Sequence, residues 1–280
     1  MRLDSYLSEK HRKRRRERRW IFAALAGAAV VLVAAGVLWI ILHSPLFRVD
    51  RVTVAGNQMV PSDDVTAIAE AAAIRGSLWK AVLGYGNMLA WPGALAASDL
   101  AYDPRLASVS LSKDYFSHTI TINVAERTPA GIWCFMPKGS AAGGGGTAGA
   151  ANESCYWFDA NGFMFARALD TQGNLIFVVH DLSQADPGLA HGILPAEFAP
   201  NLMSVLNALR ASGVGVTDIV FKDLSLEEID VTTSNGPALY FSLRFPSDED
   251  TAVLEHLMGQ PGFDRLEYID FRVANRAYYK

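Results

Sequence analysis

The sequence is constrained most by one apolar run near its N-terminus, WIFAALAGAAVVLVAAGVLWIIL, which extends from Trp20 to Leu42 and contains no charged residue. An α-helix rises about 1.5 Å per residue, so this run reaches roughly 35 Å and exceeds the ~30 Å hydrocarbon core of a bilayer. Trp20 and Trp39 stand near its two ends, where indole rings favour the membrane interface. The run therefore predicts a transmembrane helix over residues 20–42.

A cleaved signal peptide is the alternative interpretation, because it too places an apolar run after basic residues. This run is much longer than the apolar region of a signal peptide, and no small-x-small cleavage motif follows Leu42. We therefore expect the segment to be retained as a membrane anchor.

Basic residues are distributed unevenly across the span. Residues 1–19 contain nine Lys or Arg residues, whereas the fifteen residues after Leu42 contain only Arg48 and Arg51. The positive-inside rule places the basic tail in the cytoplasm and the chain after His43 outside it. The run HRKRRRERR could instead bind nucleic acid, but a position beside lipid headgroups explains it without a further partner. The sequence predicts a single-pass type II membrane protein.

The part of the chain after the span is acidic. Residues 43–280 carry 16 basic and 26 acidic side chains. Such a charge argues against nucleic acid or anionic lipid as the main ligand of this part. We expect the charge to serve solubility.

Two cysteines, Cys134 and Cys155, flank the glycine-rich insertion GSAAGGGGTAGAANES in the exported part. An oxidising compartment would let them pair, and the chain-entropy model gives such a bridge about 3 kcal/mol. Neither cysteine has a neighbouring His or third Cys, so a metal site is not expected. The pattern predicts a disulfide at the base of a flexible insertion.

Residues 46–127 show the pattern of a first folded domain. VDRVTVAG alternates like a strand, and a helix begins at PSDDV with Ser62 as its N-cap and ends at Gly76. After a long connection, GALAASDLAY predicts a second helix that stops before Pro104. ASVSLSKD and HTITINVAER then predict two strands, so helices should cover one face of a small mixed sheet. The expected buried side chains are Val52, Val54, Val65, Ile68, Ala69, Ala72, Val109, Leu111, Ile120, Ile122 and Val124.

Residues 128–280 are rich in predicted strands. GIWCF, CYWFD, GFMFAR, NLIFVV, VTDIVF, LEEIDV and PALYFSLRF are short apolar or alternating runs separated by turn residues. PNLMSVLNAL predicts a helix with a buried Leu and Val stripe, and SDEDTAVLEHLM predicts a capped helix with acidic residues at its N-terminus. This domain should be a sheet with one or two helices against it. The whole chain is assigned to the α+β class.

Motifs for catalysis and metal binding are missing from the sequence. The histidines after the span do not occur in HExxH or another metal-ligand spacing. There is no G-x-S-x-G motif and no S-x-x-K accompanied by its partner motifs. His118 shares a predicted strand face with Ile120, where a hydrogen-bonded core histidine is expected. His180 and Asp181 could seed a catalytic pair, but their position after IFVV is typical of a turn. We predict a protein that is not an enzyme and holds no metal or cofactor, with an envelope hydrolase as the alternative.

The motifs occur in an order typical of one known family. A membrane span is followed by VDRVTVAGN, DPRLASVSL, ITINVAERTPAGIW, YWFDANGFMF and YIDFRVANRAYYK. This order resembles the FtsQ/DivIB cell-division proteins, whose first exported domain is a POTRA domain. The resemblance implies a non-catalytic scaffold in the bacterial plasma membrane at the division septum, with partners like FtsB and FtsL. A POTRA-type chaperone for exported polypeptides is a further alternative.

Two features depart from the family pattern. One is the glycine-rich insertion with its cysteine pair. The other is the connection SLWKAVLGYGNMLAWP, whose aromatic residues favour a core or membrane-proximal position over a binding site.

The C-terminal stretch LEYIDFRVANRAYYK predicts a half-buried strand that packs Ile269, Phe271 and Val273, followed by a kink at Ala274-Asn275. A terminal strand tends to lie at a sheet edge, which can accept a strand from a partner. The resemblance points to the same place, because FtsQ-like proteins bind FtsB by strand addition at their C-terminal end. Alternatively, this stretch only completes the sheet. The expected partner-binding residues are Tyr268, Arg272, Arg276, Ala277, Tyr278 and Tyr279.

Overall fold

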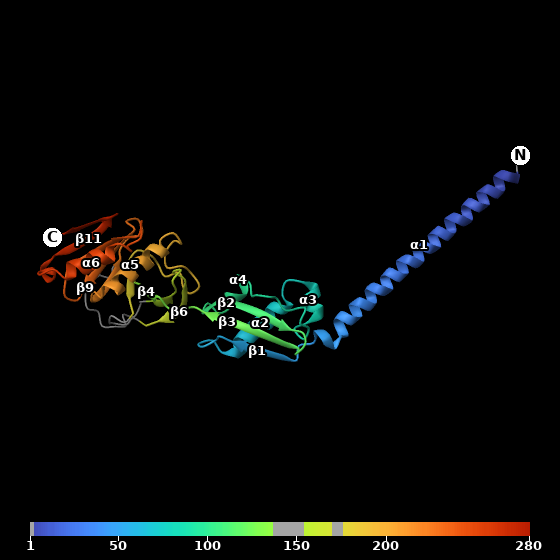
Figure 1. Ribbon diagram of the computed structural model, residues 1–280, viewed down its shortest axis with the longest axis horizontal. Helices are drawn as coiled ribbons and strands as arrows, with labels where there is room; N and C mark the ends of the chain where they lie inside the picture. The colour runs from blue at the N-terminus through green and yellow to red at the C-terminus, as the bar shows by residue number, and fades with distance from the viewer. Residues whose placement is uncertain (1–2, 137–153, 170–175) are drawn as a thin grey trace. The chain divides into compact units, whose positions relative to one another are not determined.

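The computed structural model describes residues 3–136, 154–169 and 176–280, with side chains from Arg18 onward (Figure 1). The glycine-rich insertion therefore lies outside the described residues, apart from its last residue. The chain divides into two compact units. The first comprises Met1–Asn57, Pro61–Asp99 and Val109–Val124, and the second comprises Gln58–Val60, Leu100–Ser108 and Ala125–Lys280.

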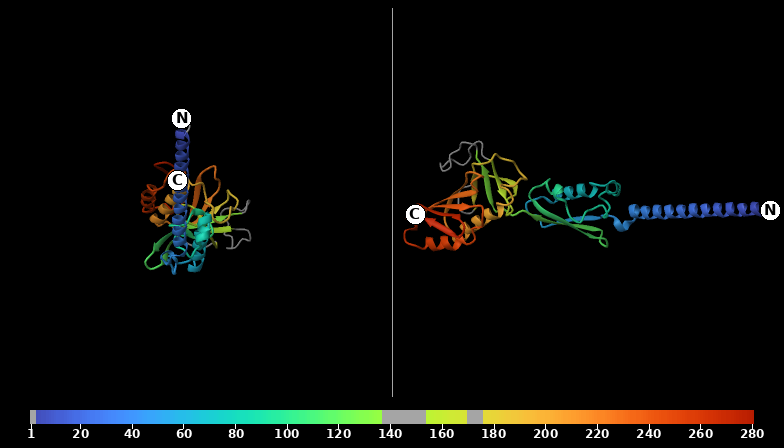
Figure 2. Two further views of the ribbon diagram at one scale, coloured as in Figure 1. Left: turned by 90° about the vertical axis from the view of Figure 1, so that its right-hand side faces the viewer. Right: turned by 90° about the horizontal axis from the view of Figure 1, so that it is seen from above.

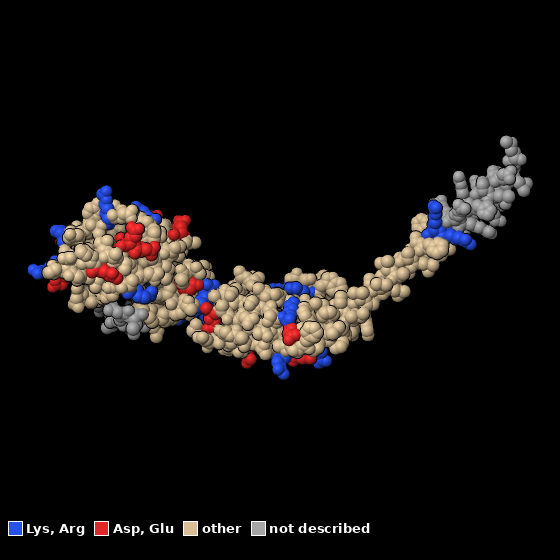
Figure 3. Space-filling model, in the orientation of Figure 1, with Lys and Arg blue, Asp and Glu red and all other residues tan. Residues whose placement is uncertain are grey.

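The chain begins with the long helix α1 (Leu3–His43). Its part Arg18–His43 is 26 residues long and apolar enough to cross a membrane. None of the most apolar window is buried by the described chain, and Figure 3 shows this stretch bare of charge with basic residues at its start. The predicted apolar helix is thus present, and a 3-10 turn, η1 (Pro45–Phe47), follows it.

The first unit contains a three-stranded sheet in the order β1-β3-β2, formed by β1 (Arg51–Ala55), β2 (Leu106–Asp114) and β3 (Thr119–Glu126). β1 and β3 run parallel, and helix α2 (Ser62–Ile74) covers one face of the sheet (Figure 2). The alternation of β2 and β3 was predicted correctly, since every side chain expected to be buried in them is buried, whereas Val52 and Val54 of β1 are only half-buried. In α2, Val65, Ala69 and Ala72 are buried as predicted, together with Ala73, while Ile68 is only half-buried.

The helices of this unit differ from the prediction in three places. The long connection contains a helix of its own, α3 (Leu78–Leu83), and the predicted second helix is reduced to one turn, α4 (Ala97–Leu100). α3 buries none of its residues, so its sequence carries no amphipathic period that would reveal it. Ser62 is not the N-cap, because the helix already begins at Ser62 and follows Pro61.

The second unit contains a nine-stranded sheet with the order β12-β11-β10-β9-β8-β7-β4-β5-β6. Helices α5 (Ala199–Ser212) and α6 (Asp250–Met258) pack on one face and share one core with the strands (Figure 2). The predicted stripe of α5 is fully buried, as Leu202, Val205, Leu206 and Leu209 are. The strands are β4 (Gly131–Phe135), β5 (Ser154–Phe158), β6 (Met164–Ala168), β7 (Val178–Asp181), β8 (Val216–Phe221), β9 (Glu228–Thr233), β10 (Ala238–Ser242), β11 (Tyr268–Val273) and β12 (Arg276–Tyr279).

The predicted terminal strand is β11, and it does not form the sheet edge. It pairs in parallel with β10 on one side and antiparallel with β12 on the other. Ile269 and Phe271 are buried as predicted, but Val273 is 46% exposed, so the prediction for this residue was wrong. The register with β12 shifts between Asp270 and Val273, and Val273 pairs with Arg276 beyond the last residue pair that β11 forms with β10, Phe241 with Phe271.

Candidate functional site

The last four-residue strand, β12, forms an edge of the large sheet. The Lys280 N–H donates to the Tyr268 carbonyl (3.3 Å), and Asp270 pairs with Tyr278 in the register. Alternate residues of an antiparallel strand direct their backbone groups to the partner strand. Ala277 and Tyr279 therefore direct their N–H and C=O groups away from β11, and no strand within the described ranges covers that side.

A tight turn makes this edge possible. Ala274 and Asn275 connect β11 to β12, and Asn275 adopts a left-handed conformation with φ of 59°. Asparagine tolerates this region better than most residues because its short polar side chain can hydrogen-bond locally. The turn reverses the chain, so the kink expected from the sequence is a hairpin.

The two faces of β12 present different side chains. Tyr279 is opposite Ile269 and shares its face, which is the face that the helices cover, and Ala277 packs against the core on that side. Arg276 and Tyr278 lie on the other face, where Arg276 Nη1 donates to Tyr278 Oη (3.4 Å). Tyr278 and Tyr279 are 48% and 59% exposed. Both faces of the edge thus carry a tyrosine that a partner can contact.

A groove of about 800 Å³ lies between β12 and helix α6. Apolar side chains from the helix and from the following 3-10 turn, η2 (Phe263–Arg265), form much of its lining, including Val253, Leu257 and Phe263. Ala277 and Tyr279 line it from the strand side. The groove can receive apolar side chains of a segment that pairs with β12.

Acidic residues also line the groove. Glu249 and Asp250 belong to its lining, at the start of α6. Burial raises the pKa of Asp250, and the nearby carboxylates of Glu249 and Asp248 act in the same direction. A basic group of a ligand would relieve this repulsion.

Arg272 is held by contacts within the protein rather than standing free. It forms ion pairs with Asp270 (2.6 Å) and Glu228 (2.9 Å), and its guanidinium lies 5.0 Å from the centre of the Tyr240 ring. Hydrogen bonds from Arg272 lower the pKa of Asp270, and the same bonds raise the pKa of Arg272. Tyr268 is half-buried, with its ring 6.1 Å from that of Tyr240. These two residues shape the sheet face beside the edge.

No pattern in the sequence predicted the groove or the role of Tyr240. The groove residues of α6 lie about twenty positions before β12, and Tyr240 lies on β10, which no local pattern pairs with β11. The parallel pairing of β10 with β11 brings Tyr240 next to Asp270. The alternating pattern of PALYFSLRF is the one signal that could have placed the Tyr240 side chain on the face of the sheet that the helices do not cover.

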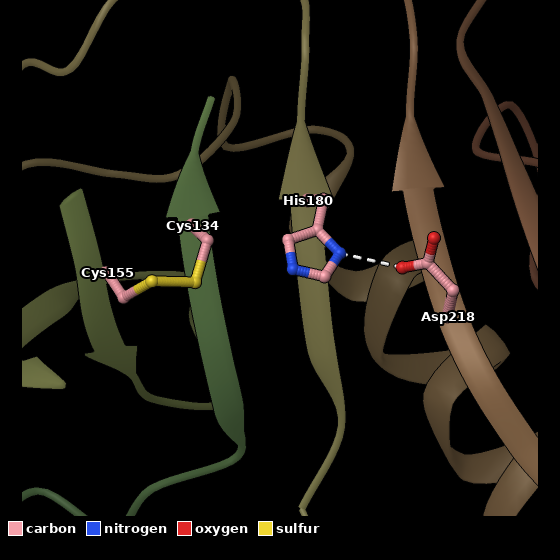
Figure 4. The surroundings of a disulfide bond; sticks show 4 residues. All are labelled: Cys134, Cys155, His180 and Asp218. Atoms are coloured by element: carbon pink, nitrogen blue, oxygen red, sulfur yellow. Dashed lines mark hydrogen bonds and ion pairs between the residues drawn. A yellow bond between two sulfur atoms is a disulfide. The ribbon is translucent and has the colours of Figure 1, made fainter. Parts of the chain in front are cut away.

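A second cluster lies on four strands of the same sheet. A disulfide joins Cys134 and Cys155, which are directly paired on β4 and β5. His180 is the register partner of Cys134 on β7, and its imidazole lies between the disulfide and Asp218 (Figure 4). His180 Nδ1 is 2.6 Å from Asp218 Oδ1.

The catalytic pair that His180 and Asp181 could have seeded does not form. Successive residues of a strand face opposite sides of a sheet, so Asp181 lies on the helix-covered face and is fully buried. Its carboxylate accepts hydrogen bonds from Ser183 N–H (2.7 Å) and from Trp133 Nε1 (3.2 Å). Asp181 thus stabilises the turn after β7, which is the role that its position in the sequence favoured. In the disulfide, Cys134 carries no thiolate, so it offers His180 no nucleophile.

His118 does not have the environment expected of it. It precedes β3 with φ of 53°, and its buried Nδ1 makes no hydrogen bond within the described structure. Its carbonyl accepts from the N–H groups of Asp50 (2.9 Å) and Arg51 (3.3 Å). The residue therefore ends a turn rather than occupying a strand face.

Within the described ranges, no three His, Cys, Asp or Glu residues form a group that could hold a metal ion. Neither a known family model nor a curated protein matches the sequence. The open edge of β12 and its groove form the candidate functional site.

Proposed function

We propose that the protein is a non-catalytic, single-pass scaffold of the bacterial division machinery, which binds septal membrane proteins through β12. Two lines support this function: the motif order that resembles FtsQ/DivIB proteins, and an unpaired sheet edge beside an apolar groove. In this proposal the basic tail is cytoplasmic and the chain after His43 is extracytoplasmic. Residues 46–127 form a POTRA-like domain that, with the span, aids recruitment to the septum.

The outward N–H and C=O groups of Ala277 and Tyr279 carry the proposal. An extended partner segment can hydrogen-bond to them and add a tenth strand to the sheet. Main-chain hydrogen bonds then supply affinity, and side chains of alternate residues supply selectivity. A partner resembling FtsB, in complex with one resembling FtsL, is the proposed occupant.

The two faces of β12 define what the partner segment should contain. Residues on one face would enter the apolar groove beside Val253 and Phe263, where a basic residue can also meet Glu249 and Asp250. Residues on the other face would contact Tyr278 and Arg276. The partner strand should therefore alternate between apolar and polar residues.

The substitution Ala277→Pro tests the proposal. Proline removes an outward N–H and adds a ring at the pairing edge, but it leaves the inward bonds of Tyr278 to β11 intact. We expect partner binding by the full chain in nanodiscs to weaken about tenfold or more, from one lost hydrogen bond of about 1 kcal/mol and the ring clash.

Ala277→Ser is the matched control, because it keeps the backbone N–H and should bind normally. The thermal unfolding temperature verifies that both variants are folded. Normal partner binding by a folded Ala277→Pro chain would contradict strand addition at this edge.

Depletion separates the scaffold from the other two functions. Cells that lose a division scaffold should fail to septate, whereas loss of a chaperone for exported polypeptides should first reduce the exported proteins. The His180–Asp218 pair is the feature that a hydrolase would need. Turnover of peptidoglycan by the purified protein, lost in His180→Gln, would favour that alternative.

A further inference from the structure

A group of apolar side chains in the first unit is largely exposed. Helix α3 has the sequence LWKAVL and buries none of its residues, and Leu78 is 89% exposed. Trp79, Val82 and Tyr85 are also largely exposed. Contiguous apolar surface on a folded domain marks an interaction site, because its exposure to water is unfavourable.

The segment after α3 is fixed to the end of the apolar helix α1. Asn87 Nδ2 donates to the carbonyl of Ile41 (2.9 Å), which lies in the last turn of α1. Met88 N–H donates to Phe47 O (2.7 Å), and Val49 N–H donates to Gly86 O (2.9 Å). α3 is therefore held close to the point where the chain leaves α1.

The β2–β3 turn reaches the same end of the first unit. The rings of Phe47 and Tyr115 meet edge to face, 6.3 Å apart. Next to Tyr115, Phe116 is 98% exposed, and Leu46 is exposed in η1. Lys113, just before this turn, has a pKa lowered by burial and by repulsion from Lys80 of α3. Two loops and η1 thus gather apolar side chains around the exit of α1.

The charge of the region fits a lipid interface. Residues 76–98 contain a single charged residue, Lys80, and no carboxylate. At the turn, Asp114 accepts hydrogen bonds from Ser117 Oγ (2.7 Å) and Phe116 N–H (2.9 Å). Tryptophan and tyrosine favour the boundary between acyl chains and headgroups, and Lys can extend its amine to the headgroups.

We propose that the surface formed by Leu46, Leu78, Trp79, Val82, Tyr85 and Phe116 inserts into the interface of the bilayer that α1 crosses. The first unit would then contact the membrane at a second point, with its apolar side chains at the depth of roughly 5–10 Å that interfacial segments reach. The hydrogen bonds from Asn87 to the last turn of α1 and from Met88 to η1 favour this occupant, because they keep the surface close to the exit of α1. The inference depends on α1 as a membrane anchor and is independent of partner binding by β12.

Quenching of tryptophan fluorescence by brominated acyl chains tests the proposal. The full chain is reconstituted at one copy per nanodisc in phosphatidylcholine with or without bromine. The substitutions Trp20→Phe and Trp39→Phe remove the two tryptophans of the span. Trp91 and Trp133 are buried and Trp157 is half-buried on β5, so Trp79 should account for the remaining quenching.

Addition of Trp79→Phe to this background should abolish the quenching, whereas the control Trp157→Phe should leave it unchanged. Neither substitution should unfold the protein, since Trp79 is largely exposed and Phe retains an aromatic ring at the half-buried position 157. Comparison of the wild-type chain with the background reports independently whether α1 is inserted. No quenching of Trp79 in chains with an inserted α1 would overturn the proposal, whether the surface then faces water, a second copy or another membrane protein.

Discussion

Gly56 is a residue whose missing side chain is required by the sheet of the first unit. Its φ is +89°, and a Cβ there would lie 2.3 Å from the Val124 carbonyl oxygen of β3. Gly76 has a similar φ of +86° but open space around it. The two glycines therefore separate the cost of the conformation from the cost of a backbone clash.

We expect Gly56→Ala to destabilise the protein by about 3 kcal/mol or more, because it adds the clash to the left-handed strain. Gly76→Ala should cost only the strain, about 1–2 kcal/mol. Denaturant unfolding of the full chain in detergent measures both values. Equal losses in the two variants would show that β3 can move away from Gly56.

Glu126 connects the end of β3 to the segment before α2. Its carboxylate accepts N–H bonds from Gln58 (2.8 Å), Met59 (2.9 Å) and Val60 (2.9 Å). Burial alone would raise the pKa of Glu126, but these donors and Arg105 outweigh it and lower the pKa. The stabilisation is therefore present above the unfolded-state pKa of about 4.3 and is lost as the pH falls through the folded-state pKa.

Replacement of Glu126 by Gln should destabilise the protein by about 1 kcal/mol at pH 7. The difference from the wild type should shrink below about pH 4, where the wild-type carboxyl is protonated too. Unfolding measured from pH 3 to 8 checks this, with the exposed Glu197→Gln as control. A loss that is the same at every pH would mean that the charge of Glu126 is not what stabilises the segment.

At the scale of secondary structure, the bridge between β4 and β5 gives a direct test. Cys134 and Cys155 close a loop with a sequence separation of 21 residues. We expect no thiol to be labelled in the unfolded, unreduced protein, and two after reduction. Reduction should lower the free energy of unfolding by about 3 kcal/mol in the chain-entropy model. Two labelled thiols before reduction would contradict the bridge.

The sequence predicted those elements whose burial follows a regular period. β2, β3 and α5 each have one covered face, so their apolar residues recur at the spacing of a strand or a helix. α3 is only six residues long and fully buries none of them, so it shows no such signal. Long-range pairing was equally hidden, because Asp218 lies 38 positions from His180 and reaches it only through the parallel pairing of β7 with β8.

The open edge of β12 likewise depends on pairing that local sequence does not reveal. The run YIDFRV alternates as β11 does. No local pattern, however, shows that β10 pairs with one side of β11 and that β12 pairs with the other side. The predicted residues Ala277, Tyr278 and Tyr279 do lie on an open edge, whereas Arg272 is engaged by Asp270 and Glu228. The hairpin at Asn275 determines which residues lie on the unpaired edge strand.

For the whole molecule, orientation in the membrane and folding of the second unit should be coupled. The proposed topology depends on the nine basic residues of the tail. Only an exported second unit meets an oxidising compartment, so only the correct orientation allows Cys134 and Cys155 to pair. The disulfide therefore reports the orientation of each chain.

We expect that replacing Arg12, Lys13, Arg14, Arg15 and Arg16 by Gln would invert a fraction of the chains. Those chains would keep both cysteines reduced, so thiol labelling of denatured, unreduced protein should rise from none toward two per inverted chain. External protease should spare the same fraction in spheroplasts, because its second unit stays inside. Replacing Arg48 and Arg51 by Gln is the control, since it strengthens the charge difference and should leave every cysteine paired. Full pairing in the tail variant would mean that the span or the units after it, rather than the basic tail, determine the orientation.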